Sequence, residues 1–326
     1  MNFLILVITL SFLTQTTFCT EKMIVSVPLV DLMMRYDTVN KLSQYPILSG
    51  RVLHSTQLLF GEKLIMHEKK ELFLKVSTPD QMGYVGWIKK TQANQVKTFP
   101  AYNSIVQNPW TALYQVEKKP QTITMYIPCG SRLITEKYTA NKHFLIVKLS
   151  DNKKALIRKE NITNFPVTMP QDHASCKKLR EKIIKNAYKF LNTPYCYSGR
   201  SAYNAYNTQE QLTGLDCSGL VNISFLAAGI IIPRPSYGQY AHSRRITRKL
   251  EPADLIFRAA ASQKNKIAHV MMYLGNGNII ESTGQKPGKV HIVSVEEKIG
   301  VPIKKLHHGD IVGRYAYYLG SFFPDV

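Results

Sequence analysis

Short apolar runs fill the first half of the chain. Between residues 20 and 165 they are rich in β-branched and aromatic residues, and turn-forming residues break them about every ten positions. This pattern predicts strands joined by turns, so we expect an all-β region. Its clearest runs are KMIVSVPLV, KLIMHE, LFLKVS, YVGWIKK, TITMYI and FLIVKL.

The all-β region contains two pairs of similar segments at one common spacing. In both pairs the second segment follows the first by 69 positions. One spacing that holds at two separate places favours an internal duplication, and chance matching of apolar and basic strings is the alternative. We expect two copies of a small barrel, at residues 20–92 and 93–165. The paired segments are GEKLI (61–65) with GSRLI (130–134) and GWIKK (86–90) with ALIRK (155–159).

The pattern changes to helices after a linker at residues 164–172, which holds two prolines and few apolar residues. Residues 177–191 repeat apolar positions every four residues, which predicts a helix with one apolar face and one basic face. A second helix is expected from Ser218 to Ala228, because Gly229 is a good residue to end it. The apolar positions of the first helix are Leu179, Ile183, Ala187 and Leu191.

Strand-like runs follow the two helices. Helices that precede a run of strands are typical of an α+β domain, which we place at residues 166–326. The expected strands are DLIFRA, HVMMYLG, NIIEST and, near the end of the sequence, IVGRYAYYL.

The first 19 residues differ from the rest. Phe3 to Leu13 form an uncharged apolar run that is too short to span a bilayer as a helix. Thr17 and Cys19 supply small residues at the −3 and −1 positions of a cleavage site, so we expect a signal peptide at 1–19 and export to the periplasm or cell envelope. No Lys or Arg precedes the run. Lipidation at Cys19 is a weaker alternative, and no later stretch is expected to cross a membrane.

Length and charge narrow the class of protein. A chain of 326 residues with 44% hydrophobic content is expected to fold into two or three globular domains. The formal net charge of +20 implies an anionic partner such as acidic lipid or carboxylate-rich wall material. A general basic bias explains the charge equally well. Nucleic acid is not expected as a partner, because no nucleic-acid motif accompanies the charge.

Cys217 is the strongest candidate for chemistry. It lies in LDCSGL (215–220), directly before the second predicted helix, and a helix N-terminus favours the thiolate form. If Cys217 is free, an odd number of cysteines is left (Cys129, Cys176 and Cys196), which argues against a complete disulfide framework. No C-x-x-C or H-E-x-x-H spacing occurs, so nothing suggests a metal.

A nucleophilic cysteine needs a base within reach. His269 is the best of nine histidines because it begins an apolar strand, where burial would hold its ring. His54, His67 and His143 lie in the β-region, His173 in the linker, His242 and His291 in polar stretches without an evident anchor, and His307 and His308 in a loop-like segment.

Five short motifs follow one another between residues 185 and 283: NTPYCYSG (192–199), DCSGLV (216–221), IPRPSYGQY (232–240), EPADLIF (251–257) and HVMMYLGNG (269–277). In this order they resemble the motifs of the NlpC/p60 family of cell-wall cysteine peptidases, which are G-T-P-Y-x-W-G-G, the nucleophile motif, L-P-R-x-S-x-x-Q, P-G-D-L-x-F and H-V-G-I-Y-x-G-x-G. The upstream β-modules resemble the bacterial SH3-like domains that accompany such peptidases.

The resemblance implies a papain-like fold and hydrolysis of the γ-D-glutamyl–diaminopimelate bond in wall stem peptides. Cys217 would be the nucleophile and His269 the general base. It implies no cofactor, and we expect a monomer that binds peptidoglycan stem peptides or their fragments. Tyr195, Asp216, Ser218 and Ser236 would line the substrate pocket.

Several positions depart from the family pattern. Tyr197 replaces a Trp, Ala253 replaces a Gly, and an insertion at 204–213 lengthens the loop before the nucleophile. The family usually has a third polar residue, often His, twelve positions after the base, and this chain has Glu281 there. A carboxylate is able to orient an imidazole and stabilise its charged form, so Glu281 joins the expected catalytic group. The alternative is an inward Glu without a catalytic role.

The predicted hairpin after His269 tests that assignment. A two-residue turn at Asn276-Gly277 would pair Met272 with Glu281 and put Glu281 on the opposite face from His269. A three-residue loop, 275–277, would instead pair Met271 with Glu281, so that His269 becomes a neighbour on the same face. The proposed role therefore requires the second register.

Two other functions are compatible with the same residues. One is a wall-binding protein whose catalytic domain is weak or inactive, and the other is an acyltransferase or deamidase that uses the same Cys–His pair. For the peptidase we expect a preference for peptides with a free N-terminal L-Ala, because Asp216 lies beside the nucleophile and a substrate amine would offset its charge.

Overall fold

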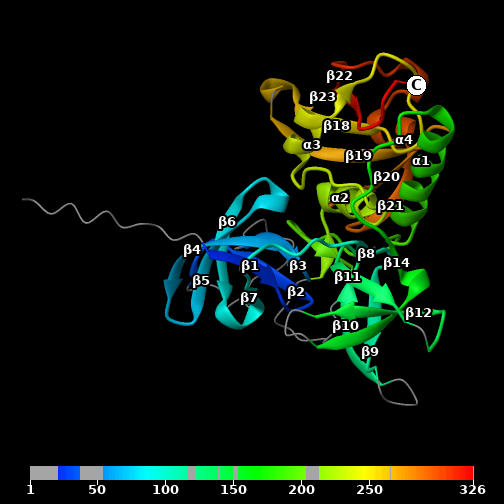
Figure 1. Ribbon diagram of the computed structural model, residues 1–326. Helices are drawn as coiled ribbons and strands as arrows, with labels where there is room; N and C mark the ends of the chain where they lie inside the picture. The colour runs from blue at the N-terminus through cyan, green and yellow to red at the C-terminus, as the bar shows by residue number, and fades with distance from the viewer. Residues whose placement is uncertain are drawn as a thin grey trace, which may run out of the picture.

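The structure is a computed structural model that describes residues 21–36, 54–116, 122–138, 140–149, 153–202, 213–264 and 266–325. It has two β-rich parts and a mixed α/β part in the second half of the chain (Figure 1). The expected leader at 1–19 lies outside the described residues. So does the insertion at 204–213, apart from its last residue.

The first β-rich part is a sheet of seven strands in the order β3-β2-β6-β5-β4-β1-β7. Most neighbours are antiparallel, and alternating burial along β5 marks one face as the core side. The strands are β1 (Glu21–Val25), β2 (Leu29–Met33), β3 (His54–Leu59), β4 (Lys63–Lys70), β5 (Phe73–Thr78), β6 (Tyr84–Lys89) and β7 (Ala93–Gln95).

The second β-rich part repeats this topology, with the order β10-β9-β13-β12-β11-β8-β14. Each strand has its counterpart seven strands earlier, and β14 begins 69 positions after β7. The predicted duplication is therefore confirmed. The strands are β8 (Ser104–Val106), β9 (Trp110–Tyr114), β10 (Ile123–Pro128), β11 (Arg132–Lys137), β12 (Phe144–Lys148), β13 (Lys154–Arg158) and β14 (Ile162–Asn164).

The predicted barrels are not closed in the part of the chain that the structure describes. β3 and β7 lie at opposite ends of the first strand order, as β10 and β14 do in the second. The two parts are thus described as seven-stranded sheets.

The second half of the chain places helices before a sheet, as predicted. α1 (His173–Tyr188) and α2 (Cys217–Leu226) pack on the sheet β17-β23-β18-β19-β20-β21. No helix among the described residues is long and apolar enough to cross a membrane. The other elements are β15 (Arg200–Ser201), β16 (Gly214–Leu215), α3 (Ser236–His242), β17 (Arg244–Arg245), β18 (Leu255–Ala260), β19 (Ile267–Gly275), β20 (Asn278–Ser282), β21 (Val290–Ser294), α4 (Val295–Ile299), β22 (Ile311–Val312) and β23 (Tyr315–Ser321).

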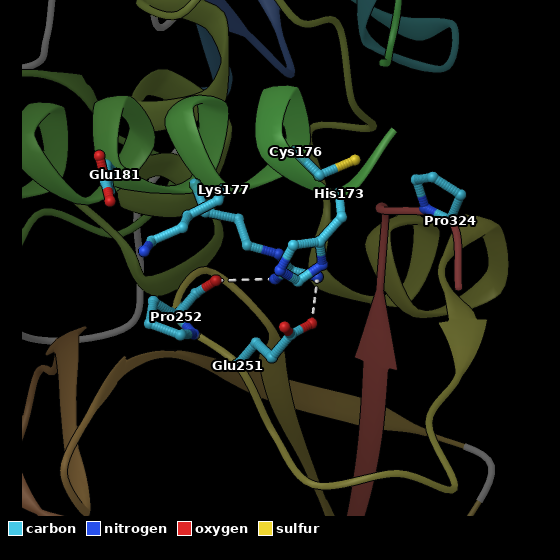
Figure 2. A pocket seen from close by; sticks show the side chains of 8 residues that line it. His173, Cys176, Lys177, Glu181, Glu251, Pro252 and Pro324 are labelled. Atoms are coloured by element: carbon cyan, nitrogen blue, oxygen red, sulfur yellow. Dashed lines mark hydrogen bonds and ion pairs between the residues drawn. The ribbon is translucent and has the colours of Figure 1, made fainter. Parts of the chain in front are cut away.

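Arg180 attaches α1 to the turn before β18. Its guanidinium donates to the Pro252 carbonyl at 2.7 Å, lies 3.1 Å from a Glu251 oxygen, and contacts the buried Asp254 carboxylate at 2.9 Å. These contacts border a cavity of about 290 Å³, which is lined by His173 and Cys176 of α1 and by Glu251 and Pro252 (Figure 2).

One core runs through all three parts. Leu29 and Leu59 of the first sheet and Ile105 of the second belong to the same buried cluster as α1 and α2. Gly130, with a φ of 85°, lies where the parts meet, and a Cβ there would come within 2.8 Å of both Ile223 and Leu59.

A buried ion cluster crosses the same junction. Glu62 follows β3 in the first sheet and accepts from Arg200 of β15 at 2.9 and 3.0 Å. Arg132 of β11 lies 3.9 Å from Glu62 and also pairs with Asp80. The first sheet is thereby fixed against α2 and the segment that leads into it (Figure 1).

Candidate active site

Cys217 is the first residue of α2. Asp216 is the N-cap, and its Oδ1 accepts the Gly219 N–H at 2.5 Å. This cap holds the first turn, so the thiol lies where unpaired backbone N–H groups favour a negative charge. Cys217 is half-buried, whereas the free thiols of Cys129, Cys176 and Cys196 are buried.

Asp216 is already paired within the protein. Arg234, which is fully buried, donates to both carboxylate oxygens, from Nη1 at 3.0 Å and from Nη2 at 2.9 Å. The same Nη1 donates to the Ser218 hydroxyl at 2.8 Å. Arg234 therefore already offsets the charge of Asp216, and the reason given above for a substrate amine at this place is wrong.

α3 supports the other side of the nucleophile. Gln239 donates from Nε2 to the Ser218 carbonyl and to the Pro233 carbonyl, both at 3.0 Å. Ser236 begins α3 and is half-buried. Among the described residues we find no hydrogen bond from its hydroxyl to Cys217 or His269.

His269 lies between Cys217 and Glu281. Its Nε2 donates to Glu281 Oε2 at 2.5 Å. The ring also lies close enough to Cys217 for that side chain to affect its pKa. Burial lowers the pKa of His269, but the charge of Cys217 and the hydrogen bonds with Cys217 and Glu281 outweigh it and raise the pKa to about 9. The imidazole is therefore held in its charged form over the neutral pH range.

The hairpin between β19 and β20 has the register that this contact requires, for an unexpected reason. Gly275 pairs with Asn278 around a two-residue turn, but Leu274 is an extra residue in β19. The bulge shifts the register, so that Met272 pairs with Ile280 and Met271 therefore faces Glu281. The two-residue turn, which alone would place Glu281 on the face opposite His269, is therefore present. The bulge at Leu274 shifts the register so that Glu281 and His269 lie on the same face.

Glu281 is fully buried and has two further partners. His291 of β21, directly opposite Glu281, donates to Oε1 at 3.1 Å, and Lys298 of α4 pairs with the same oxygen. Burial raises the pKa of Glu281, but the hydrogen bond and charge of His269, followed by Lys298, lower it to about 2. The view that His291 lacks an anchor is thus wrong, and the sequence reasoning missed Lys298.

Tyr195 lies close to Cys217, and two residues of the first sheet lie close to Asp216 and Arg234. Burial, then the charges of Cys217 and Asp216, raise the pKa of the Tyr195 phenol. Tyr84 of β6 is close enough to Arg234 and Asp216 to be affected by their charges. His54 of β3 is fully buried, and burial together with Arg234 lowers its pKa to about 4, so this ring is neutral.

This arrangement supports nucleophilic acyl transfer. A cysteine at a helix N-terminus, a histidine close to it and a carboxylate that orients the histidine ring are the parts that activate a cysteine nucleophile. Across the described residues, no group of three or more His, Cys, Asp or Glu side chains is arranged to hold a metal ion.

The comparisons with known proteins identify this part of the chain. Residues 192–311 match the profile of the NlpC/P60 family. A Bacillus cereus protein named gamma-D-glutamyl-L-lysine dipeptidyl-peptidase is 28% identical over 241 residues, which is 70% of this chain and 66% of the relative. A Bacillus subtilis protein of the same name is 26% identical over 75% of this chain and 77% of its own length.

A solved structure extends the likeness in fold to nearly the whole chain. The crystal structure of an NlpC/P60 family protein from Bacillus cereus has a TM-score of 0.70 and 23% identity, and the match covers 93% of this chain and all of the other. Residues 192–311 of the chain therefore belong to a cysteine peptidase domain of the NlpC/P60 family.

Proposed function

We propose that this protein hydrolyses the bond between γ-D-glutamate and a diamino acid in peptidoglycan stem peptides. The arrangement of Cys217, His269 and Glu281 carries the proposal, because it supplies an activated thiolate and a proton donor in contact with it. The names of the Bacillus relatives support the γ-D-glutamyl specificity. Those names favour lysine as the diamino acid, whereas the motifs of the family favour diaminopimelate.

The reaction proceeds through a thioester. The Cys217 thiolate attacks the γ-carbonyl carbon, and the N–H groups of the first turn of α2 stabilise the oxyanion. His269 gives its proton to the leaving amine as the C–N bond breaks. The neutral imidazole then takes a proton from water, which hydrolyses the thioester and releases the γ-carboxylate. Collapse of the tetrahedral intermediate breaks the C–S bond and expels the Cys217 thiolate beside the imidazolium, which restores the pair, and the new carboxylic acid loses its proton to solvent.

Glu281 acts through His269 and is a positioning residue in this reaction. Its carboxylate accepts from Nε2, which orients the ring, leaves Nδ1 for proton transfer and stabilises the imidazolium. We assign Tyr195, Asp216, Ser218 and Ser236 to the walls of the substrate pocket. Ser218 and Asp216 also hold Arg234 and the cap of α2.

The first sheet is proposed to close the pocket at the substrate's N-terminus. Tyr84 and His54 lie on the Asp216 and Arg234 side of the nucleophile, which is where the family resemblance puts that end of the peptide. The relatives are named dipeptidyl-peptidases, which is consistent with a pocket that holds only a short peptide on the N-terminal side of the cleaved bond. We propose that both β-rich parts are SH3-like modules and that the protein acts in the cell envelope after removal of a leader at 1–19.

The test compares wild-type protein with Cys217→Ala on two synthetic tripeptides, L-Ala-γ-D-Glu-L-Lys and L-Ala-γ-D-Glu-diaminopimelate. Mass spectrometry should show release of L-Ala-γ-D-Glu from at least one of them by wild type alone. Cys217→Ala should lose all measurable turnover and keep its fold, because the thiolate is the nucleophile. Intact peptides with wild type, or equal cleavage by the variant, would refute the proposal.

A further inference from the structure

The carboxylate of Glu281 is held on both of its oxygens. Oε2 accepts from His269, and Oε1 accepts from His291 and pairs with Lys298. The three partners come from β19, β21 and α4, and Glu281 itself is fully buried in β20. A buried carboxylate is costly unless it is paired and hydrogen-bonded.

Lys298 is placed for this contact by a short helix. α4 spans Val295–Ile299 and is capped by Ser294, whose hydroxyl accepts the Glu297 N–H at 3.1 Å. Val295 and Ile299 pack into the core, so the helix is anchored without help from Lys298. Only 15% of the Lys298 side chain is exposed, because it points toward Glu281 instead of solvent.

The contact has a consequence for the charge on the imidazole. If His269 were the sole partner of Glu281, the full carboxylate charge would stabilise the imidazolium, which must lose a proton to the leaving amine. A lysine on the opposite oxygen draws part of that charge away. The other charged and titratable groups around this site are Cys217 on α2, Arg258 opposite His269 on β18, and Tyr317 on β23, near enough to Glu281 to be affected by its charge.

We infer that Lys298 and His291 are positioning residues for the reaction: Lys298 limits how strongly Glu281 stabilises the His269 imidazolium, and His291 fixes the carboxylate in place. The inference rests on the proposed function for its role in turnover. The protonation of His269 is measured without any peptide substrate.

Alkylation of Cys217 by chloroacetate gives that measurement. The reagent is an anion, so its reaction with the thiolate is favoured while His269 is charged, and the rate falls as the imidazolium loses its proton. Lys298→Met should move this descending limb upward by about 1 pH unit, because the Glu281 charge is less offset. Lys298→Arg should keep the limb at the wild-type pH, and Glu281→Gln should move it downward.

Lys304→Met is the matched control, since it removes one exposed lysine six positions further along the chain, outside the hydrogen bonds of Glu281. If Lys298→Met does not fold, Lys298→Gln keeps a donor, removes the charge and should give the same upward shift. In a Glu281→Gln background, the Lys298→Met shift should largely disappear. A limb that stays in place with Lys298→Met, or moves as far with Lys304→Met, overturns the inference for Lys298.

His291 is tested by turnover on the cleaved tripeptide. His291→Phe leaves Oε1 with one donor fewer, and we expect kcat to fall about tenfold with KM nearly unchanged. His291→Gln retains an amide donor and should recover most of kcat. Equal rates for the two variants would remove His291 from this role. Failure of both tripeptides with wild type would contradict the proposed substrate and leave the alkylation result valid.

Discussion

At the scale of single residues, the His269–Glu281 pair carries opposite charges over a wide pH range close to Cys217. The pKa of His269 is raised to about 9, so its positive charge is present throughout neutral pH and is lost as the pH rises through 9. The pKa of Glu281 is lowered to about 2, so its negative charge persists down to strongly acidic pH. The charged pair therefore exists between these two values.

Glu281→Gln tests this account of the pair. The amide still accepts a hydrogen bond from Nε2 but carries no charge, so the imidazolium should lose its proton at lower pH. We expect the basic limb of kcat/KM against pH to move below 9 and kcat to fall, with little change in KM. A full pH–rate profile on the cleaved tripeptide provides the measurement. An unmoved basic limb would mean that Glu281 is purely structural.

The sequence located residues whose signal is local. Cys217 precedes a helix, and Glu281 follows His269 at a fixed distance along one hairpin. Arg234 could also have been identified from the sequence, since it lies inside the IPRPSYGQY motif. Lys298 could not, because its contact depends on how α4 packs over the sheet, and strand periodicity does not encode that packing.

At the scale of elements, the first turn of α2 depends on a side chain from a distant loop. Asp216 caps the helix, and Arg234 donates to that buried carboxylate and orients it. The β19–β20 hairpin shows a similar dependence. Alternation along its strands allowed two registers, and a bulge at Leu274, which no local pattern indicates, decided between them.

Arg234→Met tests the support of α2. The substitution leaves Asp216 buried without its cation, and breaking such a pair costs about 3 kcal/mol of unfolding free energy. Chemical denaturation followed by circular dichroism measures that loss. Arg158→Met is the control, because Arg158 lies 3.8 Å from Glu160 in a pair in which both side chains are exposed, so its loss should matter little. Similar losses for both variants would show that the Asp216–Arg234 pair is not special.

At the scale of the whole molecule, the two sheets have the same strand order but different surroundings. Tyr84 and His54 of the first are close enough to Asp216 to be affected by its charge, and the second packs against α2 through Ile105 and Cys129. The common spacing of 69 residues predicted the repeat. It did not predict the junction, because Glu62, Arg132 and Arg200 are far apart in sequence and meet only when the three parts pack together.

Glu62→Gln tests whether this junction makes the parts one folding unit. Losing the Glu62 charge leaves two buried arginines undercompensated, and we expect a loss of about 3 kcal/mol or a separate early unfolding transition. Scanning calorimetry distinguishes these results from a single unchanged transition. Glu160→Gln alters an exposed pair with Arg158 in the second part and should leave the transition in place. An unchanged Glu62→Gln transition would show that the apolar core alone joins the parts.

The position of the first sheet also predicts which peptides are cleaved. Tyr84 is close enough to Asp216 to be affected by its charge, and we propose that the first sheet ends the pocket at the first amino acid of the substrate. An acyl group on that amine would have to displace the first sheet, which the Glu62 cluster and the shared core hold in place. Arg234 already neutralises Asp216, so we expect exclusion of the acyl group, more than attraction of the amine, to set the preference.

L-Ala-γ-D-Glu-L-Lys should therefore be cleaved with a kcat/KM at least about tenfold above that of its N-acetylated twin. Glu62→Gln, if it stays folded, should lower the ratio of the two kcat/KM values, because the first sheet would be held less firmly. Equal rates for the two peptides with wild type would mean that the pocket is open at this end and that stems still attached to glycan are cleaved as well.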